Sequence, residues 1–255
     1  AYVDGPAWDS LDEGGRHAVT ARTVLRQAKA DLVLSHVSAL DEYDAPTWGV
    51  DLSVVHVTRP DGKAGRKERG IQQHCGVLLD EDVTTLNGVP VTTPTRLALD
   101  ITTLVDVEAG LGIVNHLLHE GLTSTGELEA RYASMDHWPN TLRTDLVLRL
   151  ANPLIESLGE SRTDYLCFSQ HLPRPIPQYE VCDRFGNVVA RLDFAWPEHG
   201  VYLEFDGRVK YERLLREGET ASDAVIREKR REEMVCELTA GGASGSPGRT
   251  CTRPR

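Results

Sequence analysis

Three carboxylates stand close together in one short stretch of an otherwise apolar sequence. Residues 193–207 read DFAWPEHGVYLEFDG, in which Asp193, Glu204 and Asp206 lie among aliphatic and aromatic residues. Burying one unpaired carboxylate is costly, so three of them require a compensating positive charge, a retained proton or a bound cation. Mg²⁺ prefers carboxylate oxygens as protein ligands, which makes a metal site one interpretation of the stretch.

The alternation of this stretch predicts two antiparallel strands joined by the loop PEHG. If Trp196 pairs with Val201, then Asp193 lies opposite Glu204, with their Cβ atoms about 5 Å apart. Because side chains alternate between the two faces, we expect one acidic face and one apolar face. Arg191 belongs to the acidic face and could neutralise part of it, so four interpretations stay open: this ion pairing, a retained proton, a metal ion, or a plain solvated face.

The wider segment resembles the PD-(D/E)XK nuclease superfamily, most closely the endonuclease-like domains related to very-short-patch-repair enzymes. The residues that carry the resemblance are a strand Asp-Phe pair, a Glu-x-Asp-Gly run, a following basic residue, a glutamate in the preceding helix and an Arg-rich helix: Asp193-Phe194, Glu204 to Gly207, Lys210, Glu160 and REKRREE. The resemblance implies a restriction-endonuclease-like fold of α-β-β-β-α order over residues 152–238. It also implies hydrolysis of DNA phosphodiester bonds that depends on Mg²⁺ or Mn²⁺.

In such a site Asp193 and Glu204 would hold the metal, which polarises the phosphate and lowers the pKa of a bound water. The position two residues after the glutamate, usually a lysine, is Asp206 here, so Lys210 or Lys229 would have to supply the positive charge. This departure leaves open a nuclease fold that binds DNA without cleaving it. The candidate catalytic residues are Asp193, Glu204, Asp206, Lys210, Lys229 and Glu160.

The net charge of −11 excludes a general attraction for nucleic acid, so any contact with DNA must come from local basic patches. The two candidates are the loop 59–70 and the run 227–232. A solvated loop and an ordinary helix face paired with its own glutamates are the alternatives. The candidate DNA-binding residues are Arg66, Lys67, Arg69, Arg227, Arg230 and Arg231.

The first half of the chain resembles AbiEi-type antitoxin-like proteins. The resemblance rests on the order of a helix, SHVSAL, VHVT, a basic loop and VPVTTPTRLALDI, and not on residues that carry chemistry. In those proteins a winged-helix domain usually precedes this region; it would lie before Ala1, so we expect it to be missing from this sequence. The resemblance implies a DNA-associated or partner-binding module, and hence a second function: a non-enzymatic DNA-binding or antitoxin-type regulator. A third possibility is an acidic interaction protein without a metal.

Periodicity, capping residues and turn signals predict a mixed α/β (α+β) fold. The expected helices are 8–30 (capped by Asp9 or Ser10), 35–40 (capped by Ser35), one from Thr93 with Pro94 in first position, 106–119, 123–134, 140–151, 160–171 and 217–238. The expected strands are 51–58, 70–75, 77–80, 83–91, 177–183, 187–196 and 200–206. We expect three parts: an antitoxin-like module that ends in helices (1–151), the endonuclease-like domain (152–238), and a disordered tail (239–255) that a frameshift near residue 240 would explain.

The remaining signals are largely exclusions. The five cysteines are scattered without metal-binding spacing, and no apolar run approaches the roughly 18 residues of a membrane span. No signal peptide is recognisable, so we expect a cytoplasmic protein. Residues 1–151 hold 13 Lys and Arg against 22 Asp and Glu, which makes this half the acidic one. Six histidines without ligand spacing are interpreted as structural: His36, His56, His74, His116, His119 and His171.

Overall fold

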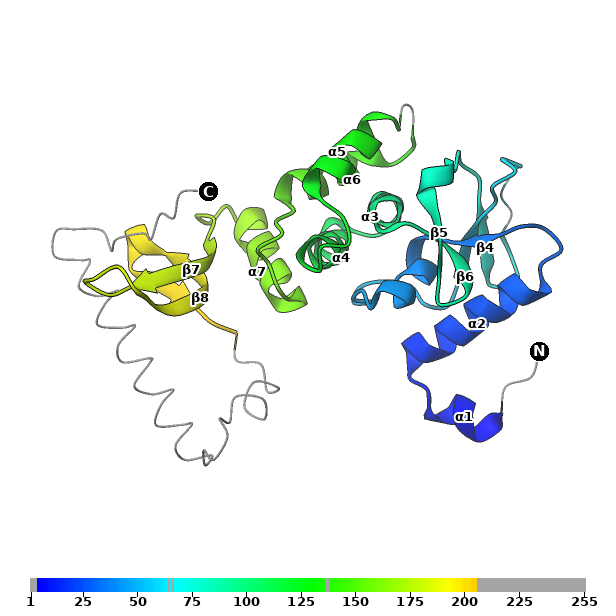
Figure 1. Cartoon of the computed structure of the whole chain (residues 1–255), viewed down its shortest axis with the longest axis horizontal. Coiled ribbons are helices and arrows are strands. Elements are labelled where there is room, and N and C mark those ends of the chain that lie inside the picture. Colours follow the sequence, from blue (N-terminus) through cyan, green and yellow to red (C-terminus); the bar gives the residue numbers. More distant parts are fainter. Residues whose placement is uncertain (1–3, 64, 66, 136–137, 206–255) are drawn as a thin grey trace. The chain divides into compact units, whose positions relative to one another are not determined.

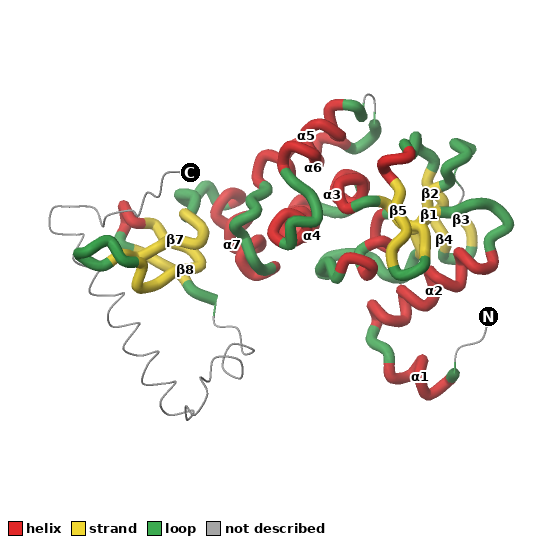
Figure 2. The backbone as a smooth tube through the Cα atoms, in the orientation of Figure 1, coloured by secondary structure: helices red, strands yellow, loops and turns green. Residues whose placement is uncertain are grey.

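The structure, a computed structural model, describes residues 4–205 except 64, 66, 136 and 137 (Figures 1 and 2). The chain forms two compact units, residues 1–162 and 163–255. Helices and two sheets are both present, which confirms the predicted α+β class. The division at residues 151 and 238 stays a prediction, and both the helix predicted at 217–238 and the tail lie outside the described residues. No helix among the described residues is long and apolar enough to cross a membrane.

The first unit is built on a mixed sheet in the strand order β3-β4-β2-β1-β6-β5. The pairs β1–β6 and β2–β4 are parallel, and the other neighbours are antiparallel. All four residues of β2 are buried, as expected for a strand in the middle of a sheet. The strands are β1 (Val33–Leu34), β2 (Val55–Thr58), β3 (Lys67–Glu68), β4 (Ile71–His74), β5 (Val83–Leu86) and β6 (Val89–Thr92).

Two of the predicted strands of this sheet differ in the structure. Asn87 and Gly88 have φ angles of 51° and 78°, so a two-residue turn splits the expected strand 83–91 into the hairpin β5–β6. The expected strand 77–80 is wrong, because this segment leads into the short 3₁₀ helix η3 (Asp80–Asp82). The hairpin β3–β4 has the same kind of turn at Arg69 and Gly70, with φ angles of 47° and 76°.

The helices of the first unit follow most of the sequence signals. The segment expected as a helix at 35–40 is a 3₁₀ helix, and Ser35 precedes it without the expected capping hydrogen bond from its side chain. The expected helix 8–30 is two helices, and Asp12, not Asp9 or Ser10, caps the longer one by accepting a hydrogen bond from the Gly15 N–H at 2.8 Å. Pro94 opens its helix as predicted. The helices are α1 (Gly5–Ser10), α2 (Glu13–Gln27), α3 (Pro94–Thr102), α4 (Val107–His119), α5 (Thr125–Ala133) and α6 (Thr141–Leu150), with the 3₁₀ helices η1 (His36–Ala39) and η2 (Asp41–Tyr43).

The helices of the first unit form two groups (Figure 1). Helix α2 packs against β1 and β2, whereas α3 follows β6 directly and packs against α4, α5 and α6. Helix α4 is almost entirely buried, so it forms the centre of this helical group. The expected helices from Thr93 to residue 151 are therefore confirmed.

The second unit contains an antiparallel sheet of β7 (Ile176–Cys182), β8 (Val188–Trp196) and β9 (Val201–Leu203). These strands agree with the three that the sequence predicts. Tyr179, Val181, Ala190 and Leu192 form its buried core. Helix α7 (Leu158–Ser169), also predicted, begins in the first unit and ends in the second, and a short 3₁₀ helix η4 (Pro197–His199) joins β8 to β9.

A buried arginine connects the strands to the helices in the first unit. The Arg96 side chain is 2 % exposed, and it donates hydrogen bonds of 2.8 Å to Asp82 Oδ2, Asp100 Oδ1 and the Val77 carbonyl. Its guanidinium also lies over the Trp138 ring, 4.5 Å from the centroid. A planar guanidinium suits this role because it can serve several acceptors and stack on an aromatic ring at once.

A second arginine completes the network from another helix. Arg131 on α5 donates to both oxygens of Asp82, at 2.8 and 2.7 Å. Two arginines therefore balance the two carboxylates Asp82 and Asp100, and the four side chains join η3, α3 and α5. Buried charges are tolerated in proteins only when they are paired and hydrogen-bonded in this way.

Arg96→Met should lower the free energy of unfolding by about 3–5 kcal/mol, because two buried carboxylates would lose their partner. Arg149→Ala is the control: it removes an exposed arginine that pairs with Asp145 at 3.5 Å on α6, and it should cost about 0.5 kcal/mol at most. Urea unfolding of the three proteins measures both values. Equal losses in the two variants would contradict a supporting role for the Arg96 network.

Candidate functional site

The predicted register of the acidic hairpin is confirmed. Trp196 pairs with Val201 and Phe194 with Leu203, which puts Glu204 at the register position opposite Asp193. The half-buried Asp193 does more than face this neighbour: its Oδ2 accepts a hydrogen bond from the Phe205 N–H at 2.6 Å. The carboxylate thus holds the chain that follows β9, a structural role that leaves Oδ1 for other contacts.

The apolar face of this hairpin is confirmed on one strand only. Leu192 and Phe194 on β8 are fully buried, whereas Val201 on β9 is 52 % exposed. The expectation for Val201 is wrong because β9 is a three-residue strand at the edge of the sheet, and Val201 is its first residue after η4. Arg191 lies on β8 in register with Glu180 of β7.

The predicted metal set is only partly within the described residues. Asp193 and Glu204 are described, while Asp206, Lys210 and Lys229 lie outside. Among the described residues, no three His, Cys, Asp or Glu side chains are grouped so that they could hold a metal ion. The catalytic and metal-binding assignments therefore stay predictions.

Glu160, the predicted contribution of the preceding helix, has a local structural role. Its carboxylate accepts hydrogen bonds from the Ser157 hydroxyl at 2.8 Å and the Glu156 N–H at 3.1 Å, and Ser157 Oγ accepts from the Glu160 N–H at 3.2 Å. This reciprocal arrangement is similar to a capping box at the start of α7, with the Glu156 N–H in place of the Ser157 N–H. Glu160 belongs to the first unit and Asp193 to the second, so their shared site stays a prediction.

The basic loop forms an exposed hairpin. Lys67 and Arg69 are exposed on β3 and its turn, whereas Arg59 is engaged by Asp61, with which Lys63 also pairs at 3.5 Å. The remaining predicted DNA-binding residues lie outside the described part of the chain: Arg66, Arg227, Arg230 and Arg231.

Three of the histidines that the sequence marks only as structural form one cluster. The rings of His36 and His74 stack with their centroids 3.7 Å apart, and the rings of His56 and His74 lie 5.1 Å apart. His56 Nδ1 and His74 Nε2 are 2.8 Å apart, a hydrogen bond that requires one ring to donate and the other to accept. The cluster was not predictable from spacing, because His56 and His74 are brought together only by the parallel pairing of β2 and β4.

The surroundings keep these histidines neutral. Burial, reinforced by the neighbouring His74, lowers the pKa of His56 to about 4, and burial together with His36 lowers the pKa of His74 to about 3. The pKa of His36 is also well below its usual value, through burial and then through His56 and Arg96. Neutral, stacked rings direct their nitrogen lone pairs along parallel planes, which does not suit a shared metal ion.

Asp100 has one carboxylate oxygen without a hydrogen-bond partner among the described residues. Its Oδ1 is bound by Arg96, but Oδ2 is buried without a hydrogen bond and lies 3.8 Å from His36 Nδ1. Burial therefore raises the pKa of the Asp100 carboxyl, although Arg96 opposes the effect. His36 itself has a φ angle of 51°, an unusual conformation for a residue with a side chain. The region can bind protons on acidification.

A second small network lies on the far side of His56. His17 Nδ1 lies 2.7 Å from the Leu52 carbonyl and Nε2 lies 2.9 Å from Ser38 Oγ, which also accepts from the His56 N–H. The geometry is that of a serine activated by a histidine. Both side chains are almost fully buried, so Ser38 is not placed to meet a substrate.

One family model matches part of this first unit. The family model for the AbiEi antitoxin C-terminal domain matches residues 46–149. The matched segment runs from before β2 into the last turn of α6, and it contains His56, His74 and the Arg96 network. No curated protein and no solved structure matches the chain.

The antitoxin-like resemblance of the first half is therefore supported by a family match, whereas no comparison supports the nuclease resemblance of residues 152–238.

The histidine cluster predicts a loss of stability on acidification. A histidine whose folded pKa lies below its unfolded pKa of about 6.5 contributes stability that is complete above pH 6.5 and lost as the pH falls. For His56 the loss should extend down to about pH 4 and reach about 1–2 kcal/mol. The raised pKa of Asp100 has the opposite effect on stability, because this carboxyl binds a proton more readily in the folded state. Only one carboxyl contributes this gain, whereas three histidines contribute the loss.

His74→Gln tests this linkage, because an amide can replace the ring as a hydrogen-bonding group but does not titrate. The decrease in the free energy of unfolding between neutral pH and mildly acidic pH should be smaller than in the wild type. His119→Gln, on the exposed end of α4, is the matched control and should leave the decrease unchanged. Identical pH profiles for all three proteins would exclude the cluster as its cause.

Proposed function

We propose that the chain is an antitoxin-type regulator: a protein that neutralises a toxin partner and contacts DNA without cleaving it. The observation that carries this proposal is the match of residues 46–149 to the AbiEi antitoxin C-terminal domain. A regulator acts through its surface, and its interior has only to hold that surface in place. The closed network of Arg96, Arg131, Asp82 and Asp100 suits such a scaffold, because most of its polar atoms are already bonded to one another.

Neutralisation is tested by growth. Toxins and their antitoxins are produced together, so the protein encoded by the adjoining gene is the toxin candidate. Induction of that gene should arrest growth of a host, and co-expression of the full chain should restore it. Arg149→Ala should still restore growth, whereas Arg96→Met should restore it less well, because the substitution destabilises the antitoxin-like segment. Growth arrest that the wild-type chain does not relieve would refute the proposal.

DNA is the partner that we propose for the basic hairpin. Lys67 on β3 and Arg69 in the turn that follows it are both exposed. The tight turn at Arg69 and Gly70 restricts the backbone at this end of the hairpin. Asp61 reduces the positive charge of the preceding loop by pairing with Arg59 and Lys63. Contacts from exposed cations to phosphates position a protein on DNA but carry no sequence preference by themselves.

Fluorescence anisotropy of a labelled duplex should detect this binding at low salt. Lys67→Ala with Arg69→Ala should weaken it roughly tenfold and make it less dependent on salt, because two phosphate contacts are lost. Arg26→Ala with Lys29→Ala removes the same charge from an exposed site at the end of α2 and should have little effect. Equal weakening by the two pairs would indicate an unspecific charge effect instead of a hairpin site.

Metal-dependent cleavage of DNA is the second candidate function. The observation that favours it is the register of β8 and β9, which brings Asp193 and Glu204 to opposite positions. These two carboxylates would hold Mg²⁺ or Mn²⁺, and the metal would activate a water for attack on a phosphate. The bond from Phe205 N–H to Asp193 Oδ2 leaves Oδ1 as the available ligand atom on this side chain.

Isothermal titration with Mn²⁺ tests this second function. If the site exists, Glu204→Gln should weaken binding at least about tenfold, because a carboxylate ligand is replaced by a neutral amide. Glu198→Gln makes the same change on exposed η4 and should leave the titration unaltered. Indistinguishable titrations of the wild type and Glu204→Gln would show that these carboxylates bind no metal.

A further inference from the structure

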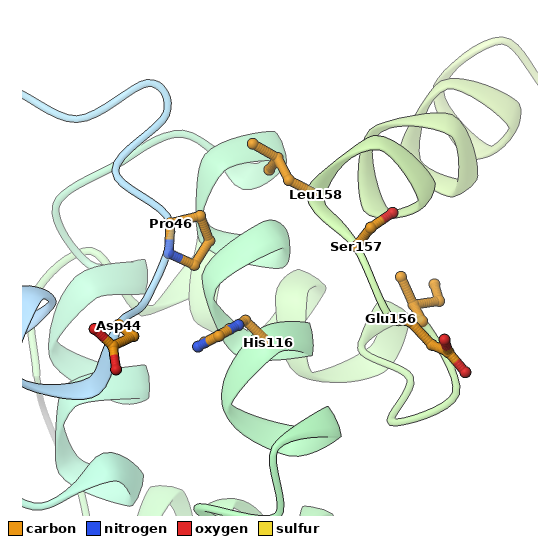
Figure 3. A pocket seen from close by; sticks show the side chains of 7 residues that line it. Asp44, Pro46, His116, Glu156, Ser157 and Leu158 are labelled. Atoms are coloured by element: carbon orange, nitrogen blue, oxygen red, sulfur yellow. The ribbon is translucent and has the colours of Figure 1, made fainter. Parts of the chain in front are cut away.

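A small cavity lies in the first unit where two separate segments cross α4. Its volume is about 150 Å³, and the segment 44–46, His116 of α4 and the segment 155–158 line it (Figure 3). Pro46, Ile155 and Leu158 give it an apolar wall. None of the functions considered above uses this cavity.

The walls of the cavity are held in fixed positions. A Cβ atom on Gly112 would lie 2.6 Å from Leu158 Cδ1, so the missing side chain allows Leu158 to lie directly against α4. Asn115 accepts a hydrogen bond from the Asn152 N–H at 2.8 Å and donates one to Ser161 Oγ at 3.1 Å. The segment from Asn152 to Ser161 is therefore fixed to α4 at both ends. A preformed cavity loses less entropy on binding than one that must be ordered.

The polar rim of the cavity is acidic. Asp44 is exposed and has a φ angle of 51°, and Figure 3 shows the His116 ring pointing toward it below Pro46. His116 Nε2 lies 3.3 Å from the Tyr43 carbonyl and can donate to it, so this ring helps to hold the turn that carries Asp44. The Asp44 carboxylate has no hydrogen bond or ion pair with another described residue.

The neighbourhood of the cavity adds negative potential. Burial raises the pKa of Asp41, and the nearby Glu42 and Asp44 carboxylates add to the effect. Arg22 opposes this effect on Asp41, but its guanidinium is bonded to both oxygens of Glu42. A positively charged group is therefore favoured at the rim.

An exposed aromatic side chain follows the first of the two lining segments. Trp48, four residues after Asp44, is 38 % exposed and packs under the Arg162 guanidinium, 4.1 Å from the ring centroid. Glu108 on α4 holds Arg162 in place through a 2.8 Å bond. Leu158 of the cavity wall lies one helical turn before Arg162 on α7. Ordered tryptophan and arginine side chains beside a cavity are typical of the centre of a protein interface.

We propose that this surface binds a protein partner by receiving one of its lysine side chains in the cavity. The aliphatic part of the lysine would lie along Pro46, Ile155 and Leu158, and its ammonium group would reach the Asp44 carboxylate. Lysine fits better than arginine, because its unbranched aliphatic chain and compact ammonium group suit a cavity of about 150 Å³ better than the wider planar guanidinium does. The lysine chemistry of the cavity is independent of the proposed function, and only the identification of the partner as a toxin rests on it.

The test is an NMR titration of the ¹⁵N-labelled full chain with N-acetyl-lysine methylamide. The matched ligand is N-acetyl-norleucine methylamide, which has nearly the same aliphatic chain but no charge. The lysine derivative should shift the amide signals of residues 44–48, of His116 and of residues 155–158, with saturation in the millimolar range. Norleucine should produce no saturable shifts there, because the acidic rim would have no cation to bind.

Asp44→Asn should weaken binding of the lysine derivative about tenfold, as expected for the loss of one charge-assisted hydrogen bond. Asp31→Asn makes the same change at an exposed residue away from the cavity and should preserve the affinity. Shifts that do not saturate, that spread over the acidic surface, or that respond equally to the two substitutions would overturn the proposal. Saturable binding at the cavity in a chain that fails to neutralise a toxin would uphold the lysine site and refute the antitoxin function.

Discussion

The structure of the first unit depends on keeping a buried group of charges neutral overall. Arg96 and Arg131 carry two positive charges, and Asp82 and Asp100 carry two negative ones, in a region almost closed to water. An additional charge there would be unpaired in a medium of low polarity. The adjacent histidines add no charge to this region, because burial and the neighbouring histidine rings lower the pKa values of His56 and His74. The same four side chains join α3 and α5 to η3.

Local signals in the sequence were sufficient for most elements. Pro94 at the start of α3 and the alternation of β8 fix these elements through backbone geometry and side-chain periodicity alone. The errors arose where a short turn outweighed a longer pattern. Asn87-Gly88 divides an apparent strand into a hairpin, and Asp12 starts a new helix within a segment that was expected to be one continuous helix. The strand β1, only two residues long, has no periodicity to detect.

Side-chain clusters were less predictable than elements. The opposition of Asp193 and Glu204 followed from the sequence, because a short hairpin fixes its register through its loop. The meeting of His36, His56 and His74 depends on a parallel pairing of strands and on contacts between distant segments. No spacing along the chain encodes such pairings. The cavity at Asp44 belongs to the same class, since its lining comes from segments more than a hundred residues apart in sequence.

The strand order of the first sheet has a consequence for synthesis on the ribosome. The two-residue strand β1 pairs with β2 on one side and with β6 on the other, through Leu34 and Val91. One side of β1 therefore has no strand partner until residue 91 has left the exit tunnel, and the carboxylate of Asp82 lacks its second arginine until residue 131 has followed. Contacts that are so distant in sequence form late. The nascent amino-terminal region therefore exposes a strand edge and an incompletely paired carboxylate during its synthesis, a period in which a chaperone or an early-binding partner has access to it.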